Sequence, residues 1–184
     1  MNVKDKKRGR PAGGKEGFSK EAIIRTANAF MLDSGKVPSI RQLASILQVD
    51  AMAIYYYFKS KDILLEEVTI SLINEIYQPT NLVSWEIELE QLCISYLNLL
   101  TQYSGLLETL LGMTSVGPTT VFRDRFLKII CNLKLDDEMK KHCLNLLVDY
   151  LHGFALAMNN NRSKDPLLLD DIKGPISLIC KIMG

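Results

Sequence analysis

Apolar residues recur along the chain at steps of three and four positions from Phe18 onward, and strict alternation of apolar and polar residues is scarce. Steps of this length place apolar side chains on one face of an α-helix, whereas alternation is typical of a half-buried strand. Residues 1–17 have neither pattern and are polar, basic and rich in glycine. The sequence therefore predicts an all-α protein preceded by a flexible arm.

Capping signals divide the first part of this pattern into three helices. The first is expected to begin after Ser19 and to end at Gly35, a residue that readily adopts a left-handed cap. Ser39 and Gln42 have the spacing of a capping box at the start of a second, short helix. Asp50 caps a third helix after a brief turn. Two short helices joined in this way describe a helix-turn-helix unit.

The remaining pattern predicts six more helices. The fourth begins at Ser60 and is stopped before Pro79, because proline cannot continue a helix. The last two helices carry apolar stripes that are strong for a chain this small, so we expect a buried partner surface there as well as a core. The six segments are about 60–77, 84–103, 106–111, 118–133, 136–159 and 165–183.

The third helix presents apolar anchors on one side and aromatic residues on the other. At about 100° per residue, Ile54 and Phe58 point inward, whereas Met52, Tyr55 and Tyr56 point outward. A tyrosine ring can contact a thymine methyl in a DNA groove, and its hydroxyl can bond a base edge or a phosphate. The alternative is that these tyrosines pack against the body or against another protein.

Charge is divided unevenly, although the formal net charge is only +1. Residues 1–65 carry 12 lysines and arginines against 6 aspartates and glutamates, whereas residues 66–184 carry 10 against 15. A basic N-terminal part on an acidic body is expected if only the N-terminal part faces a polyanion. This asymmetry surrounds the helix-turn-helix unit, so it favours DNA as the partner of the outward tyrosines.

The residues around the third helix resemble the signature of tetracycline-repressor (TetR) type transcriptional regulators. Residues 54–64, IYYYFKSKDIL, are similar to the family pattern Leu-Tyr-x-His/Tyr-Phe-x-x-Lys-x-x-Leu. Residues 39–44 and Val49 match the family's second helix and turn. Gln48 departs from the pattern, which usually has glycine in the turn, and Ile54 replaces leucine. The resemblance covers residues 18–68.

The resemblance implies an architecture and a function. Residues 1–17 would be a flexible basic arm, residues 18–65 a three-helix DNA-binding head, and residues 66–184 a helical domain that binds an effector and dimerises. A homodimer would place two heads about 34–36 Å apart on a palindromic operator. The protein would be a repressor that a small molecule releases from double-stranded DNA. A chromosome-organising DNA-binding protein without an inducer would share every feature of the head.

The resemblance also assigns DNA contacts by position. Arg41 would contact a phosphate or a base edge, and Tyr57 and Lys61 would hold the DNA backbone. Ala51 and Met52 carry no strong hydrogen-bond donors, so shape and methyl contacts would carry much of the specificity. The full set expected at DNA from the helices is Ser39, Arg41, Ala51, Met52, Tyr55, Tyr56, Tyr57 and Lys61.

The arm contains Arg8-Gly9-Arg10-Pro11, which resembles the core of an AT-hook. In such a segment, glycine permits close approach, proline fixes an extended backbone, and arginine follows the negative potential of a narrow minor groove. The alternative is a nonspecific polybasic tail that adds affinity by counterion release. Either interpretation places Arg8 and Arg10 on DNA.

The resemblance further implies that the body holds an effector pocket and a dimer interface. Aromatic and methionine residues at helical spacing form cores more often than ligand pockets, and their apolar character favours an apolar effector. The candidates to line the pocket are Trp85, Tyr96, Met113, Phe122, Phe126 and His152. The candidates for the dimer interface are Leu147, Leu151, Phe154, Met158, Ile172, Ile176, Ile179 and Met183.

The sequence offers no motif for catalysis, metal binding or membrane insertion. Four widely spaced cysteines and two histidines lack metal-ligand spacing, and there is no Ser-His-Asp, Walker or GxGxxG pattern. Apolar runs stay well short of the roughly 20 residues of a membrane-spanning helix, and the basic N-terminus is not a secretory signal. We therefore expect a cytoplasmic protein that is not an enzyme and needs no cofactor.

Overall fold

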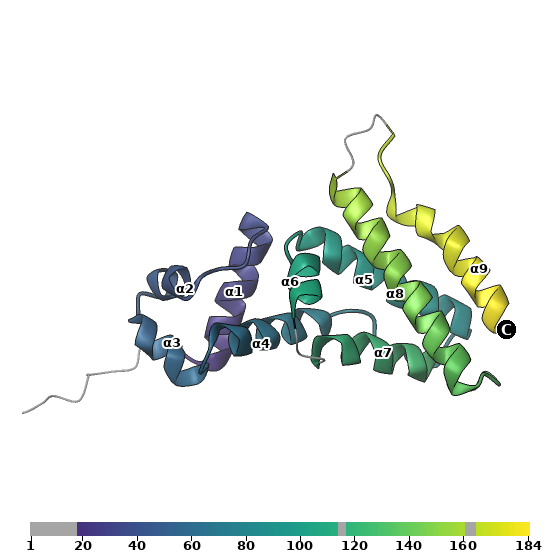
Figure 1. Ribbon diagram of the computed structural model, residues 1–184, viewed down its shortest axis with the longest axis horizontal. Coiled ribbons are helices and arrows are strands. Elements are labelled where there is room, and N and C mark those ends of the chain that lie inside the picture. Colours follow the sequence, from purple (N-terminus) through teal and green to yellow (C-terminus); the bar gives the residue numbers. More distant parts are fainter. Residues whose placement is uncertain (1–17, 114–116, 161–164) are drawn as a thin grey trace, which may run out of the picture.

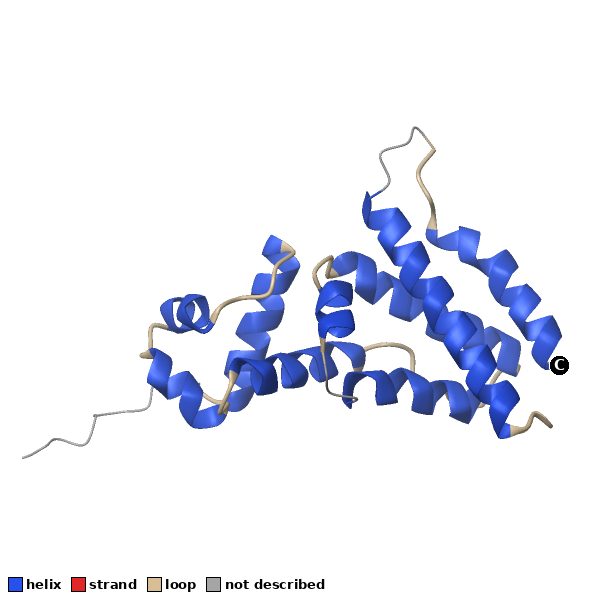
Figure 2. Ribbon diagram, viewed as in Figure 1, coloured by secondary structure: helices blue, strands red, loops and turns tan. Residues whose placement is uncertain are grey.

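A computed structural model describes residues 18–113, 117–160 and 165–184 of the 184-residue chain. Every regular element in these ranges is helical, which confirms the predicted all-α fold (Figure 2). The helices are α1 (Lys20–Ser34), α2 (Ile40–Leu47), α3 (Ala51–Tyr57), α4 (Lys61–Ile73), α5 (Trp85–Gln102), α6 (Leu106–Gly112), α7 (Gly117–Ile129), α8 (Asp137–Asn160) and α9 (Lys173–Met183).

The helices form two groups joined by α4 (Figure 1). We call α1–α3 the head and α5–α9 the body. The helix α4 packs on α1 at one end and on α7 at the other. The helices α8 and α9 lie side by side at the end of the molecule away from the head (Figure 1). Within the described ranges, no helix is both long and apolar enough to cross a membrane.

The predicted caps of the head are confirmed. The Ser19 hydroxyl accepts from the Ala22 N–H at 3.2 Å, and Gly35 ends α1 with a left-handed φ of 64°. Ser39 and Gln42 form the capping box of α2. At the end of α2, Gln48 has φ 54°, so a non-glycine residue occupies the left-handed position where the family usually has glycine. The turn geometry is thus retained despite the substitution.

Two helix boundaries differ from the sequence prediction. The helix α4 ends at Ile73, and the next N–H groups, of Glu75 and Ile76, bond carbonyls only three residues back. The last helix begins at Lys173 instead of 165, after a 3₁₀ helix at Leu169–Ile172. Pro166 explains part of this shift, because a proline disfavours helical backbone at the residue before it.

One continuous apolar core runs from the head through α4 into the body. In the head, Ile23, Leu43 and Phe58 are fully buried, so three short helices share one centre. A short turn of the body, Ser104-Gly105, lies against the end of α1. A Cβ atom on Gly105 would lie 2.6 Å from the Gly35 carbonyl oxygen, so glycine is needed where these backbones meet. Head and body therefore touch directly as well as through α4.

A buried carboxylate fixes the segment that follows α4. Glu88 on α5 is 1% exposed, and its Oε1 accepts from the N–H groups of Thr80 at 2.9 Å and Asn81 at 2.6 Å. The Thr80 hydroxyl also donates to Oε1, at 3.0 Å. Burial acts to raise the pKa of Glu88, but these hydrogen bonds outweigh it and hold the pKa below its ordinary value.

Candidate functional site

The helix α3 lies at the edge of the head with one side buried and the other in solvent (Figure 1). Asp50 caps its start, because its side chain accepts from the Met52 N–H at 2.7 Å. Ile54 and Phe58 have no exposed surface and anchor the helix on the core of the head. The predicted inward face is confirmed, and the opposite face of α3 is left to solvent.

The outer face of α3 carries unusually large exposed side chains. Met52 is 71% exposed, Tyr56 is 85% exposed and Tyr55 is 41% exposed. Such exposed aromatic surface is informative, because a single folded chain gains nothing from leaving it in water. Tyr57 is different, since its hydroxyl donates to the Phe18 carbonyl at 3.3 Å and its ring packs edge-on against Phe18. Tyr57 therefore braces the head against the segment that enters α1.

The other residues expected at DNA lie at the starts of α2, α3 and α4. Arg41 is exposed on the first turn of α2, and Lys61 is exposed on the first turn of α4. Ser39 is exposed but serves as the cap of α2, and Ala51 is half-buried at the start of α3. Arg8 and Arg10 lie outside the described residues.

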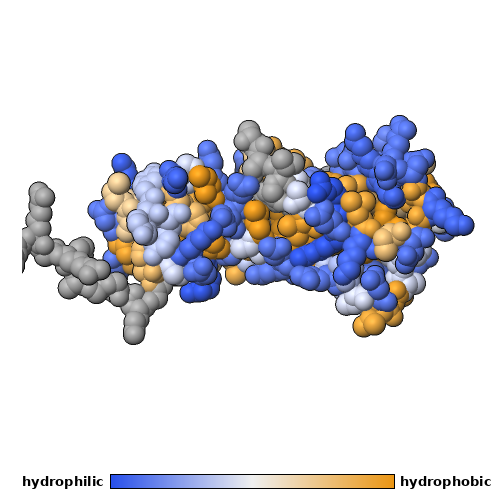
Figure 3. All heavy atoms as spheres, turned by 90° about the horizontal axis from the view of Figure 1, so that it is seen from below, coloured by the Kyte–Doolittle hydropathy of each residue, from blue (hydrophilic) through white to orange (hydrophobic). Residues whose placement is uncertain are grey.

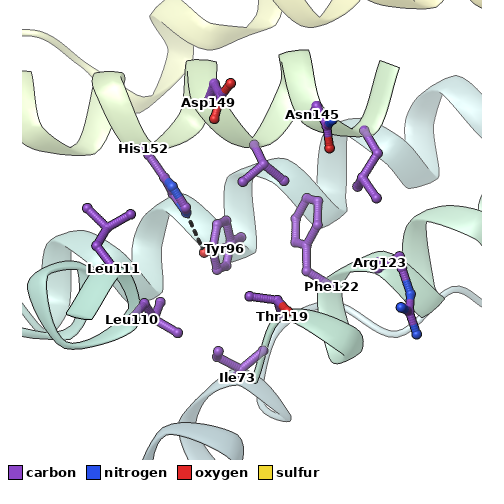
Figure 4. A pocket seen from close by; sticks show the side chains of 12 residues that line it. Ile73, Tyr96, Leu110, Leu111, Thr119, Phe122, Arg123, Asn145, Asp149 and His152 are labelled. Carbon is purple, nitrogen blue, oxygen red and sulfur yellow. Dashed lines mark hydrogen bonds between the residues drawn. The ribbon is translucent and has the colours of Figure 1, made fainter. Parts of the chain in front are cut away.

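A cavity of about 310 Å³ lies in the body (Figure 4). It is bounded by residues from five helices, α4 to α8, so its shape depends on how α4 packs against the body. Its walls are mainly aliphatic and aromatic, with polar side chains at a few points. The lining residues are Ile73, Tyr96, Leu110, Leu111, Thr119, Phe122, Arg123, Leu144, Asn145, Val148, Asp149 and His152.

Two neutral polar groups meet inside this cavity. The Tyr96 hydroxyl and His152 Nε2 are 2.8 Å apart (Figure 4), and the rings of Tyr96 and Phe122 are in contact with centroids 4.8 Å apart. Burial lowers the pKa of His152, against a smaller raising effect of Asp149, so the imidazole is neutral at pH 7. Burial also raises the pKa of the Tyr96 hydroxyl. This pair therefore offers hydrogen bonding without a charge, while an acidic and a basic residue, Asp149 and Arg123, also line the cavity.

The structure brings together three of the six residues expected in the pocket: Tyr96, Phe122 and His152. The other three do not line this cavity. Trp85 contacts Gly184 and lines a separate groove beside α9, because the start of α5 lies at the far end of the body. Met113 lines a groove between α4 and α6. Phe126 is fully buried in the core and has no surface to offer a ligand.

The residues expected at a dimer interface lie mainly inside one protomer. Six of them are buried in the core, so a second chain could not reach them. Phe154 and Met158 are half-buried and pack on the same core. The physical reason is that the strongest apolar stripes of α8 and α9 face α5 and each other. The six buried residues are Leu147, Leu151, Ile172, Ile176, Ile179 and Met183.

A different face of α8 and α9 is apolar and exposed. On α8, Met139, Leu146, Gly153 and Ala157 are exposed, and steps of seven, seven and four place them on one narrow stripe. A Cβ atom on Gly153 would meet nothing within 4 Å in the protomer. On α9, exposed apolar side chains lie at Leu178 and Ile182. We call these six residues the outer stripe. The sequence signal for it was a second, weaker apolar periodicity beside the core stripe.

Apolar surface is not confined to the outer stripe. On the face drawn in Figure 3, apolar patches over the head and the body interrupt a mostly hydrophilic surface. Leu82, in the loop between α4 and α5, is 85% exposed. It lies on neither α8 nor α9, which makes it a useful reference position for surface substitutions.

Comparison with known proteins connects these features to one family. A family model described as "Tetracyclin repressor-like, C-terminal domain" matches residues 78–169, which is half of the chain. No curated protein sequence matches the chain significantly.

Solved structures share the fold over nearly the whole chain. A single-residue variant of TetR from Acinetobacter baumannii AYE, in complex with minocycline, gives a TM-score of 0.70 at 20% identity and covers 90% of this chain and 96% of its own. BioQ with its natural double-stranded DNA operator gives 0.72 at 17%, covering 90% and 98%. ActR from Streptomyces coelicolor, in complex with actinorhodin, gives 0.74 at 18%, covering 92% and 96%.

Proposed function

The chain belongs to the tetracycline-repressor family of transcriptional regulators, and from this premise we propose that it represses transcription from a palindromic operator until a small molecule releases it. The observation that carries the proposal is the exposed aromatic face of α3 on a basic head. Residues 18–65 are proposed as the DNA-binding domain and residues 66–184 as the effector-binding and dimerisation domain, with residues 1–17 as a DNA-binding arm.

The proposed reading face is formed by Met52, Tyr55 and Tyr56, with Ala51 at its edge. In the major groove, these side chains would contact thymine methyl groups and base edges, while Arg41 and Lys61 would contact phosphates. Tyr57 would act mainly through its contact with Phe18, and Ser39 through its cap. Arg8 and Arg10 would add affinity from the arm.

The cavity in the body is proposed as the effector site. A volume of about 310 Å³ is at the lower end of the range of small-molecule pockets, about 300–1,000 Å³. The mainly apolar wall supports an apolar effector, and the Tyr96–His152 pair would orient one polar group of it. Because Ile73 of α4 forms part of the wall, an occupant would act directly on the helix that joins head and body.

A homodimer is proposed to form through the outer stripe. Exposed leucine, isoleucine and methionine side chains would be buried against a second copy, and Gly153 would allow α8 to approach its symmetry mate closely. A two-fold axis through α8 and α9 would place the two heads on successive turns of one DNA face. An effector that favours another spacing of the heads would weaken DNA binding by its differential affinity for the two states.

Replacing Tyr56 by alanine tests the reading face. A lost groove contact costs about 1–3 kcal/mol, and a dimer loses two, so we expect the affinity for operator DNA to fall by about 30-fold or more. Thermal stability should be unchanged, because Tyr56 is 85% exposed. The measurement is fluorescence anisotropy with a duplex from immediately upstream of the protein's own gene.

The matched control for Tyr56→Ala is Leu32→Ala, which removes an exposed apolar side chain from α1 of the same head. Its affinity should stay within about 2-fold of the unmodified protein. If Tyr56→Ala binds the duplex as tightly as the control, α3 is not the reading helix.

A further inference from the structure

The C-terminal end of α4 is held by one cation from α7. Arg125 Nη1 donates to the Ile76 carbonyl at 2.6 Å, and Nη2 donates to the Asn74 carbonyl at 2.8 Å. Longer contacts reach the carbonyls of Ile73 at 3.4 Å and Tyr77 at 3.5 Å. The carbonyls of Asn74, Ile76 and Tyr77 lie beyond the last residue of α4, and a guanidinium there also complements the negative end of the helix dipole.

A second cation, one helical turn after Arg125 on α7, bonds the backbone that follows α4. Lys128 Nζ donates to the Pro79 carbonyl at 2.8 Å, so two cations three residues apart hold the backbone from 73 to 79. Among the described residues, none of the ion pairs includes Arg125, so its charge is directed at backbone carbonyls. Charge-assisted hydrogen bonds of this kind are stronger than neutral ones.

The helices α4 and α7 also form one wall of the cavity. The Ile73 side chain lines the cavity from α4, and its carbonyl oxygen is within reach of Arg125. Phe122 lines the cavity from α7 (Figure 4), and it precedes Arg125 by one helical turn. An occupant that pushes on Phe122 or Ile73 therefore acts on the contact between α7 and α4, which Arg125 bridges.

We propose that Arg125 is a positioning residue that makes α4 follow α7 when the cavity is filled. This inference rests on the proposed function, because it names the residue that links the proposed effector site to α4, the helix that joins head and body. With Arg125 present, the end of α4 moves with α7, and its other end, next to α3, moves the head. Without Arg125, Lys128 of α7 still bonds the Pro79 carbonyl, but that contact lies six residues beyond the end of α4. The end of α4 itself then touches α7 through apolar side chains, which allow the helices to slide, so α7 shifts and α4 does not follow.

A cavity-filling substitution serves as the probe, so no effector need be known. Val148→Trp places an indole in the cavity from α8, and Val148→Phe is a smaller filler should the tryptophan variant fold poorly by circular dichroism. Each filler is combined with Arg125→Ala. The two readouts are affinity for the upstream duplex and hydrogen–deuterium exchange of α4 amides, which requires no DNA.

With Arg125 present, the filler should change DNA affinity at least 10-fold and change exchange across α4. In the Arg125→Ala background, the filler should change affinity less than 2-fold and leave exchange of α4 unaltered. Arg125→Lys should restore part of the response, because one ammonium can still bond a carbonyl. A filler effect of equal size in both backgrounds, or no effect with Arg125 present, overturns the proposal.

Asp124→Ala is the control. Asp124 lies on α7 next to Arg125 and outside the cavity lining, and its carboxylate accepts from Arg123 instead of bonding α4. The filler response should survive in this variant, and its loss would overturn the assignment to Arg125. If the parent protein binds no DNA, the proposed function fails on its own, and the exchange measurement still decides whether Arg125 couples the cavity to α4.

Discussion

Replacing Leu146 and Leu178 together by glutamate is expected to convert the protein from a dimer to a monomer. These side chains are 55% and 61% exposed in the protomer, so the charges cost little in the folded monomer but would be buried without partners in a dimer. Light scattering after size exclusion should give about twice the chain mass of 20.8 kDa for the unmodified protein and the single-chain mass for the double variant.

The same double variant should lose most of its affinity for a palindromic duplex. Linking two binding modules raises the overall affinity by about 10²–10⁴ over one module, so separated heads should bind at least about 100-fold more weakly. Leu82→Glu is the control, since Leu82 is exposed but lies outside α8 and α9. A double variant that remains dimeric would show that the two-fold contact uses another surface.

The second large effect concerns Glu88, the buried carboxylate beneath the segment after α4. Glu88→Ala removes the charged acceptor of the Thr80 and Asn81 N–H groups. A hydrogen bond to a charged group contributes about 1.5–3 kcal/mol, so we expect the free energy of unfolding to fall by about 3 kcal/mol on loss of the two. Glu88→Gln keeps a carbonyl acceptor and should cost about 1 kcal/mol. Urea unfolding at pH 7 measures both.

Glu88 also predicts a pH dependence with a definite sign. Burial acts to raise the pKa of Glu88, but its hydrogen bonds have the larger combined effect. The pKa of Glu88 in the folded protein is therefore below its value in the unfolded chain. Its contribution to stability is therefore complete above the ordinary pKa of glutamate, about 4.3, and is lost as pH falls through the lower folded-state pKa. The urea midpoint of the unmodified protein should drop more steeply below that pH than the midpoint of Glu88→Gln. Parallel profiles would mean that Glu88 is not ionised in the fold.

The head could be predicted closely because its signals are local. A cap such as Ser19 or Asp50 acts on N–H groups two or three residues away, so the sequence around it contains the whole interaction. Helix geometry alone predicts which side of α3 is buried, because it places Phe58 and Tyr56 on opposite faces of the helix. Even the unusual Gln48 was located, since the neighbouring pattern fixes where the turn must be.

The body was predicted less well because its features depend on how helices pack. The stripe containing Leu147 was correctly found to be apolar, but nothing local says whether a stripe faces its own protomer or another chain. Tyr96 and His152 meet from helices far apart in sequence, while Trp85 is carried elsewhere by the direction of α5. Arg125 escaped prediction because its partners are backbone carbonyls, which leave no trace in residue identity.

The most direct test of DNA reading is a salt series with the purified protein, comparing the duplex from upstream of its own gene with an unrelated duplex. A sequence-reading regulator should bind the upstream duplex about 10³-fold or more tightly than the unrelated one, and both affinities should fall steeply with salt. Equal affinity for the two duplexes would contradict sequence reading and favour a chromosome-organising role. The absence of binding even at low salt would exclude a DNA-binding function for the head.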